Sequence, residues 1–256
     1  MAREGSGEFV QSLERGLAVI TAFSSHDPRL TLADVSRLTG LSRATARRIL
    51  HTLEALGYAR SDGRQFELTP KVLDLGYAYL SSFDLTSIAQ PVMEALTQRT
   101  SESSSAAVLD GAEIVYVARV PTKRIMAISL GLGSRLPAYA TSMGRVLLAE
   151  LLPEEVDELI GPGPLTPLTD RTITKPADLH EELDRVRKQG WALVDQELED
   201  GIRSVAAPIR DRSGRVVAAM NISSHAGRVN LETIRKEFLP ALLETAELIN
   251  ERLARR

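Results

Sequence analysis

The 256-residue sequence contains no cysteine, and this absence excludes disulfide bonds and metal sites built from thiolates. It also has no apolar run long enough to cross a bilayer, and its first residues, MAREGSGEF, lack the apolar centre of a signal peptide. The four histidines are scattered along the chain without the spacing of a metal site. We therefore expect a cytoplasmic protein with no metal, no cofactor and no association with membranes.

Motifs of catalysis are missing as well. No G-x-S-x-G elbow, phosphate-binding P-loop or H-E-x-x-H helix occurs, and Gly131-Leu132-Gly133 lacks the third glycine of a dinucleotide-binding fingerprint. Asp195 and Glu197 alternate along a predicted strand, so both carboxylates are expected on one face. One interpretation of this pattern is a general acid–base pair. The favoured interpretation is that the two carboxylates make polar contacts in a pocket or belong to a solvated face. We expect no catalytic residues and no enzyme activity.

Composition and charge are those of an ordinary soluble globular protein, with 43% hydrophobic and 25% charged residues. A chain of this length is expected to form two domains. The net charge is −3, so the chain as a whole is not a non-specific binder of nucleic acid.

Residues 31–70 are the most informative segment, because they predict two helices, a tight turn and a hairpin. Gly40 stands where the first helix must end, and Ser42 is a good N-cap for the second helix. Gly57 then closes the second helix. Apolar residues recur at helical spacing on both sides of the turn, so each helix has one face for a small core. This layout is typical of a winged helix-turn-helix, which binds DNA.

The other face of the second helix carries polar and basic residues. Arginine is well suited to guanine edges and phosphates, so this face is the candidate DNA contact, although a solvated helix face would have a similar composition. The candidate residues are Ser42, Arg43, Thr45, Arg47, Arg48 and His51.

The hairpin is predicted from residues 58–61 and Gln65–Leu68 around Asp62-Gly63, a dipeptide favoured in tight turns. Arg60 and Arg64 flank its tip, where a wing reaches a phosphate or the minor groove; plain solvation is the alternative. Residues 31–64 hold six basic and three acidic residues, an excess of only three positive charges. Because one such unit neutralises few phosphates, we expect a homodimer that reads two half-sites of a palindromic operator in double-stranded DNA.

Beyond the wing, the pattern predicts an α+β arrangement with one mainly antiparallel sheet. Helices are expected at residues 70–82, Leu85–Thr100, 141–152, 154–160, Pro176–Gln189 and 230–253. Strands are expected at residues 104–109, Glu113–Val120, 125–130, 191–196, 204–210 and 216–223, and a glycine-rich loop at 131–140.

Four blocks, in order, make the chain resemble the IclR family of bacterial transcription regulators: FVQSLERGLAVITAF, GSRLPAYATSMGRVLLA, WALVDQELEDGIRSVAAPIRD and GRVVAAMNIS. The resemblance implies a winged DNA-binding domain (residues 1–69), a linker helix (70–84) and a GAF-like effector-binding domain (85–256). It also implies dimers that can pair into tetramers. YVARVPTKRIM together with LPAYATSMGR is similar to the subgroup that regulates protocatechuate, 4-hydroxybenzoate and β-ketoadipate catabolism.

The resemblance further implies an effector pocket between the loop around residues 133–144 and the last strands. Its expected residues are Arg135, Leu136, Ala138, Thr141, Ser142, Met143, Asp195, Glu197, Ser204, Ala206, Asn221 and Ser223. Independently of the family, the helix start at Thr141 and Ser142 suits a carboxylate, and Arg135 can form a bidentate clamp. Simple N-capping and an ion pair of Arg135 with an acid near residues 197–200 are the alternatives. Arg119 and Arg124 are weaker candidates for the same anion.

These features predict a ligand-responsive regulator of an aromatic-acid catabolic operon that binds a small carboxylate effector. One alternative is a related regulator that responds to another acid, such as glyoxylate or pyruvate. A second alternative is an enzyme or metabolite-binding module whose winged domain no longer functions.

Overall fold

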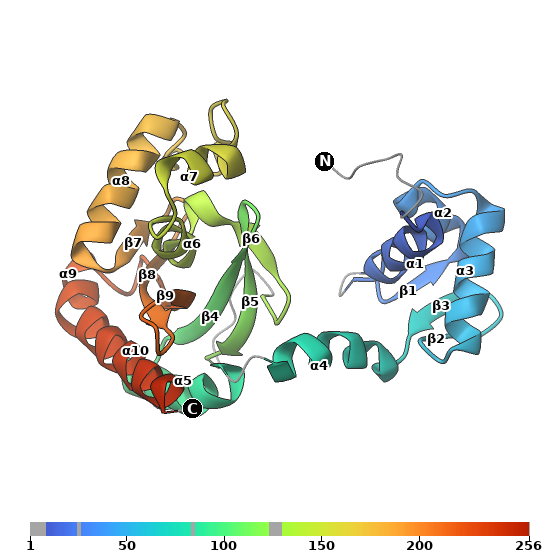
Figure 1. Ribbon diagram of the computed structural model, residues 1–256, viewed down its shortest axis with the longest axis horizontal. Coiled ribbons are helices and arrows are strands. Elements are labelled where there is room, and N and C mark those ends of the chain that lie inside the picture. The colour runs from blue at the N-terminus through green and yellow to red at the C-terminus, as the bar shows by residue number, and fades with distance from the viewer. Residues whose placement is uncertain (1–8, 25–26, 83–84, 123–129, 256) are drawn as a thin grey trace. The chain divides into compact units, whose positions relative to one another are not determined.

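The computed structural model describes residues 9–24, 27–82, 85–122 and 130–255. The chain divides into two compact units, unit 1 (Met1–Ser82) and unit 2 (Phe83–Arg256), whose elements are labelled in Figure 1. Of the described residues, none belongs to a helix with both the length and the apolar composition needed to cross a membrane.

Unit 1 combines helices with a small antiparallel sheet whose strand order is β1-β3-β2. Its elements are α1 (Gln11–Thr21), β1 (Arg29–Thr31), α2 (Leu32–Thr39), α3 (Arg43–Ala55), β2 (Ala59–Ser61), β3 (Gln65–Leu68), the 3₁₀ turn η1 (Pro70–Val72) and α4 (Leu73–Ser82). The predicted helices, turn and hairpin are confirmed, and unit 1 is a winged helix-turn-helix.

Local chemistry explains the turn between α2 and α3. Gly40 has φ +68°, a left-handed conformation that ends α2 without a steric penalty. At the other end of α2, Thr31 and Asp34 form a capping box, in which the Thr31 hydroxyl accepts from the Asp34 N–H. Val35 from α2 and Leu50 from α3 are then fully buried in one core. The turn and this shared core therefore fix the angle between α2 and α3.

Strand β1 was not predicted. Its residues pair antiparallel with β3, and Leu30 lies opposite Phe66 in the core. Three residues are too few to show the alternation by which a strand is recognised, so only the pairing with β3 defines it.

Unit 2 is an α+β domain, as predicted. Its elements are α5 (Leu85–Thr100), β4 (Ser103–Asp110), β5 (Glu113–Val120), β6 (Arg135–Pro137), the 3₁₀ turn η2 (Ala138–Ala140), α6 (Ser142–Leu148), α7 (Pro153–Ile160), α8 (Pro176–Gln189), β7 (Ala192–Asp195), β8 (Ile202–Arg210), β9 (Val216–His225), α9 (Leu231–Thr233), the π-helical turn η3 (Ile234–Phe238) and α10 (Leu239–Ala254).

The strands of unit 2 form one antiparallel sheet in the order β6-β5-β4-β9-β8-β7. Helices α5 and α10 pack against each other and against the sheet, whereas α6 packs against β7, β8 and β9 and against α8 (Figure 1). The side chains on the α6 side form a continuous core that includes Met143, Leu179 and Ala206. The sheet therefore presents one face to α5 and α10 and the other to α6.

Two expectations need correction. The glycine-rich segment 131–140 is not only a loop, because it contains β6 and η2. The C-terminal helix is interrupted by the π turn η3, just before Pro240, a residue that lacks the N–H needed to continue a regular α-helix. The strand expected at residues 125–130 falls mostly on residues 123–129, outside the described residues.

Gly144 allows α6 to approach η2 closely. A Cβ atom built on Gly144 would lie 2.1 Å from the Ala138 carbonyl oxygen and 2.4 Å from the Ala138 Cα. Both atoms belong to the backbone, so neither can move aside without shifting η2. Glycine is therefore required here for packing.

Replacing Gly144 with alanine should lower the free energy of unfolding of unit 2 by about 1–3 kcal/mol, because the added methyl overpacks the contact with η2. Gly163→Ala is the matched control, since a Cβ at Gly163 meets no atom within 4 Å. Urea unfolding of both variants, followed by fluorescence of the single tryptophan, Trp191 of unit 2, measures the difference. Equal midpoints for the two variants would show that η2 yields freely.

Candidate DNA interface and effector pocket

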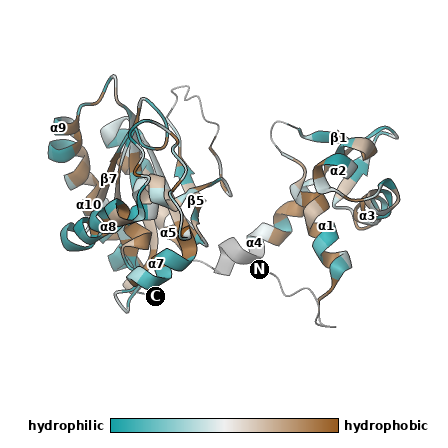
Figure 2. Ribbon diagram, turned by 90° about the horizontal axis from the view of Figure 1, so that it is seen from above, coloured by the Kyte–Doolittle hydropathy of each residue, from teal (hydrophilic) through white to brown (hydrophobic). Residues whose placement is uncertain are grey.

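Helix α3 is fixed by one face and exposes the other. Ala46 and Leu50 are fully buried, and the Ser42 hydroxyl caps the helix by accepting from the Thr45 N–H at 3.2 Å. The residues between the apolar positions are polar and exposed, and Figure 2 shows this alternation of hydropathy along α3. The helix therefore presents a rigid polar surface.

The exposed row of α3 contains Arg43, Arg47 and His51, which are spaced four residues apart and lie along one side of the helix. Arg47 Nε lies 3.5 Å from His51 Nε2, and His51 Nδ1 lies 3.1 Å from Glu54 Oε2. Among the described residues, no acid forms an ion pair with Arg43, Arg47 or Arg48. The two arginines of this row thus form a positive surface that no acid in the described part of unit 1 neutralises.

Thr45 and Arg48 lie on a different side of α3 from this row. Both line a groove formed together with α1 residues such as Leu13 and Leu17. The predicted DNA-binding residues of α3 are therefore not one stripe but two neighbouring sides of the helix.

The wing separates its two predicted arginines. Arg60 Nε donates to Glu67 Oε1 at 2.5 Å, while Arg29 Nε donates to the other carboxylate oxygen of Glu67 at 3.0 Å. The hydrogen bond from Arg60 lowers the pKa of Glu67, and that from Arg29 contributes in the same direction. Arg64 is exposed at the tip, and no ion pair joins it to an acid in the described part of unit 1. Arg64 is thus the wing arginine whose charge is available.

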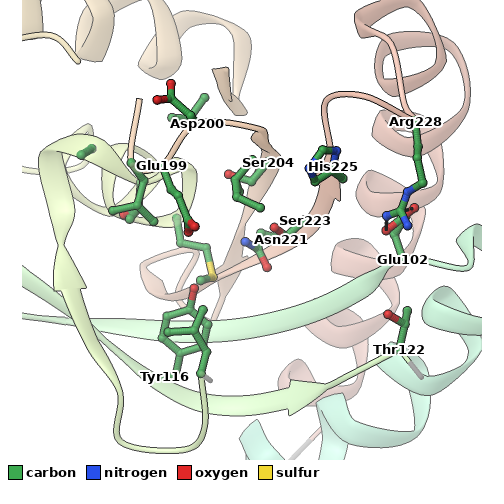
Figure 3. Close-up of a pocket in the computed structure, with 17 residues that line it drawn as sticks. Glu102, Tyr116, Thr122, Glu199, Asp200, Ser204, Asn221, Ser223, His225 and Arg228 are labelled. Carbon is green, nitrogen blue, oxygen red and sulfur yellow. Dashed lines mark hydrogen bonds and ion pairs between the residues drawn. The ribbon is translucent and has the colours of Figure 1, made fainter. Parts of the chain in front are cut away.

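Unit 2 encloses a pocket with a volume of about 370 Å³ (Figure 3). Its walls come from β5, the start of α6, the segment after β7, and strands β8 and β9. A volume of roughly 300–1,000 Å³ is usual for a small-molecule site. The pocket lies at the α6 face of the sheet and belongs to unit 2 alone.

Five of the twelve expected effector residues line this pocket: Thr141, Met143, Ser204, Asn221 and Ser223. Thr141 caps α6, because its hydroxyl accepts from the Gly144 N–H at 3.1 Å. Ser142 does not line the pocket, but its hydroxyl bonds the Ser204 hydroxyl at 2.8 Å. Leu136, Ala138 and Ala206 belong to or pack against the core beside the pocket.

Arg135 lies away from the pocket, on the edge strand β6. Its Nε donates to Glu113 Oε2 at 2.7 Å, and its Nη2 lies 2.8 Å from Asp110 Oδ2. The hydrogen bonds that Arg135 donates to Glu113 and Asp110 raise the pKa of its guanidinium. The ion-pair alternative thus holds, but with acids of the β4–β5 hairpin and not with those near residues 197–200.

Asp195 and Glu197 do not share a strand face, which corrects the expectation that they alternate. Strand β7 ends at Asp195, and Gln196 takes the left-handed φ of +63°. Asp195 pairs with Arg203 opposite it in the sheet and, at 3.1 Å, with Arg171. Burial raises the pKa of Asp195, but the hydrogen bonds from Arg203 and Gln196 outweigh it, so the pKa is lowered overall.

Glu197 is held by a buried arginine of α6. Arg145 is only 1% exposed, and its two terminal nitrogens donate to the two oxygens of Glu197 at 2.8 and 2.5 Å. Arg145 Nε donates to the Tyr139 carbonyl at 2.9 Å, and the Ile173 N–H donates to Glu197 Oε2. Because Leu198 and Glu199 follow directly and line the pocket, this pair fixes one pocket wall.

The pocket also contains residues that the sequence did not indicate. Arg228 Nη2 lies 3.2 Å from both oxygens of the buried Glu102, at one end of the pocket. Burial raises the pKa of Tyr116 to about 12, so its phenol is neutral at physiological pH. These residues are far apart in sequence, and only the folded sheet brings them together.

Two buried acceptors in this pocket have no hydrogen-bond partner among the described residues. They are Asn221 Oδ1 and Glu199 Oε2. An unpaired buried acceptor costs free energy unless a ligand or water supplies a donor. The pocket is therefore chemically incomplete without a hydrogen-bond donor.

A winged helix-turn-helix unit and a separate domain with a polar pocket of this size are the parts of a ligand-responsive transcription regulator. The model of the IclR helix-turn-helix domain matches residues 12–63, and the model of the bacterial transcriptional regulator IclR C-terminal domain matches residues 77–251. The chain belongs to the IclR family of bacterial transcriptional regulators, which are not enzymes.

Three relatives illustrate the match. The Pca regulon regulatory protein of Pseudomonas putida is 48% identical over 93% of this chain and 82% of its own length. A structure of a candidate transcriptional regulator from Rhodococcus sp. RHA1 is 53% identical, with a TM-score of 0.87 over 96% of this chain and 99% of that one. An IclR homologue from Microbacterium hydrocarbonoxydans complexed with 4-hydroxybenzoate is 26% identical, with a TM-score of 0.85 over 96% and 100%.

Replacing Arg145 with methionine should lower the free energy of unfolding of unit 2 by about 3–5 kcal/mol, because it leaves the Glu197 carboxylate buried without its cation. Arg171→Met, which breaks the exposed pair with Asp195, should cost less than about 1 kcal/mol. The double variant Arg145→Met/Glu197→Leu should regain part of the loss. Urea unfolding monitored at Trp191 compares the three, and similar losses for Arg145→Met and Arg171→Met would contradict the structural role of Arg145.

Proposed function

We propose that this protein regulates an operon for the catabolism of aromatic acids by binding operator DNA through unit 1 and a small aromatic carboxylate through unit 2. The arginines of α3, which form no ion pair with an acid of the described residues, carry the DNA-binding half of the proposal. The pocket in unit 2, with two acceptors that lack donors, carries the effector half.

In the proposed complex, α3 lies in the major groove and uses Arg43, Arg47 and His51 on base edges and phosphates. The cap residue Ser42, together with Thr45 and Arg48, contacts the flanking backbone from the neighbouring side of the helix. Arg64 reaches a phosphate from the wing tip. Arg60 acts there mainly by orienting the wing, because its guanidinium is held by Glu67.

One such unit makes few phosphate contacts, so its affinity alone is modest and sensitive to salt. We propose that the chain works as a homodimer, that two such dimers can pair into a tetramer, and that each unit 1 of a dimer reads one half-site of a palindromic operator. The helix α4 then connects DNA binding to the effector domain as a linker.

The aromatic effector is supported by the relatives. The P. putida relative is a regulator of the Pca regulon, and the M. hydrocarbonoxydans homologue was crystallised with 4-hydroxybenzoate. Of the expected effector residues, Thr141, Met143, Ser204, Asn221 and Ser223 are proposed to contact the ligand. Of the other expected residues, Glu197 holds the pocket through Arg145, Ser142 through Ser204, and the three apolar residues through the core, whereas Arg135 and Asp195 form ion pairs outside the pocket.

Replacing Arg47 with alanine should weaken operator binding by about 1–3 kcal/mol and relax specificity at one position of each half-site, because Arg47 is proposed to contact a base edge. Arg212→Ala is the control, since it removes the same charge from an exposed turn of unit 2. Fluorescence anisotropy with the intergenic DNA beside this gene measures the effect. Unchanged affinity for Arg47→Ala would exclude Arg47 from the interface.

Adding 4-hydroxybenzoate or protocatechuate should change the affinity for this DNA by about fivefold or more, the usual lower range for coupling between two sites. Glyoxylate and pyruvate serve as competing effectors in the same assay. If only glyoxylate or pyruvate changes the affinity for DNA, the effector is one of these smaller acids and not an aromatic acid. A lack of any response, with binding of an acid intact, would favour a metabolite-binding module without a regulatory role.

A further inference from the structure

A row of side chains crosses the sheet of unit 2 beside the pocket. Arg119 of β5 pairs in register with Ser105 of β4, Ser105 pairs with Asn221 of β9, and Asn221 pairs with Ala206 of β8. Directly paired residues of an antiparallel sheet point to the same face. Because Asn221 lines the pocket, Arg119 lies on the pocket face of the sheet.

Arg119 also lies between two pocket-lining residues along the chain. Tyr116 precedes it by three residues, and a bulge at Val117 of β5, opposite Ala106 and Ala107 of β4, brings Tyr116 to the same face. Thr122 follows it by three residues and lines the pocket as well. Arg119 is therefore adjacent to the pocket wall in both directions of the sheet.

Arg119 is a partly buried cation that lacks an anionic partner. Its Nη1 donates to the neutral Ser105 hydroxyl at 3.3 Å, and no acid of the described residues forms an ion pair with it. Burial of a charge without an opposite charge is costly. By contrast, Arg228, which lines the pocket, is already paired with Glu102. Arg119 is thus a cation beside the pocket that no acid of the described residues neutralises, and its charge is available for a carboxylate.

Two acceptors without donors line the pocket beside Arg119. Asn221 is 5% exposed, and neither its Oδ1 nor the buried Oε2 of Glu199 has a donor in the part of the chain that the structure describes. Figure 3 shows Glu199, Asn221 and Tyr116 around one cavity. A ligand with only acceptors, such as a saturated dicarboxylate, would leave both atoms unpaired and bring a second negative charge towards Glu199.

We propose that Arg119 binds the carboxylate of the aromatic effector and that Asn221 Oδ1 or Glu199 Oε2 accepts a hydrogen bond from a hydroxyl group on its ring. The proposal rests on the effector pocket proposed above and names its specificity-determining residues. On binding, Arg119 exchanges the Ser105 hydroxyl for the carboxylate, and the acceptors gain the donor that they lack. Acceptor-only acids are thereby rejected.

Calorimetry on the full chain tests this with four probes: 4-hydroxybenzoate, benzoate without the hydroxyl, 4-hydroxybenzamide without the charge, and adipate with two carboxylates. The unmodified protein should bind 4-hydroxybenzoate about tenfold or more tightly than benzoate and adipate, because only the first supplies a donor.

Three variants should alter this ranking, two at the hydroxyl end of the ligand and one at its carboxylate end. Asn221→Leu, which is close in volume, should bring the affinity for 4-hydroxybenzoate down towards that for benzoate, and its retained benzoate binding shows that the pocket is intact. Glu199→Gln should weaken the same discrimination without burying a new apolar group. Arg119→Met should weaken both benzoates about tenfold or more and leave 4-hydroxybenzamide within about twofold. Arg212→Met is the matched control and should change none of these affinities.

The inference is overturned if adipate binds as tightly as 4-hydroxybenzoate, if Asn221→Leu and Glu199→Gln both keep the full preference for the hydroxyl, or if Arg119→Met weakens the amide and the acids alike. Such results leave the proposed regulatory function standing if 4-hydroxybenzoate still changes operator affinity. If the ranking is as expected but 4-hydroxybenzoate does not change operator affinity, the proposed regulatory function is wrong and the proposed roles of Arg119, Asn221 and Glu199 are supported. If no hydroxybenzoate binds to the unmodified protein, both fail.

Discussion

The effector pocket depends on the buried ion pair between Arg145 and Glu197. The pair joins α6, which forms one wall of the pocket, to the segment after β7, which forms another. A buried pair of this kind contributes little net stability compared with apolar packing, but the loss of one partner is costly. Its value here is positional, because it holds the backbone next to Glu199 in a single arrangement while Gln196 takes an unfavourable left-handed conformation.

The same contrast between neutralised and available charge distinguishes the functional surfaces. Three arginines form ion pairs with acids of their own unit, and these pairs neutralise their charge within the fold: Arg60, Arg135 and Arg203. Arg47 on α3 and Arg119 on the sheet lack such partners among the described residues, and each lies where an anionic ligand is proposed. Ion pairing within the fold thus separates structural arginines from those that are proposed to bind DNA or the effector.

The sequence predicted unit 1 well because its signals are local. The roles of Gly40 and Ser42 depend only on the helix ends next to them, where Gly40 ends α2 and Ser42 caps α3. The role of Asp62-Gly63 depends only on the turn that these residues form. The effector pocket was only half predicted, because its geometry depends on partners far away in the chain. Arg135 is bound by Glu113 and Asp110, which precede it by 22 and 25 residues, so its side chain does not reach the pocket. Glu197 is bound by Arg145, which precedes it by 52 residues. Arg119 gains its importance only from the register that aligns it with Ser105 and Asn221.

The central claim is that the pocket of unit 2 and the DNA surface of unit 1 are thermodynamically coupled. Linkage requires that, if the effector changes operator affinity by some factor, the operator changes effector affinity by the same factor. Titration of 4-hydroxybenzoate into the full chain, with and without saturating operator DNA, measures this directly. We predict dissociation constants that differ by the factor seen for DNA binding in the reverse experiment. Equal constants in the two titrations would contradict the account.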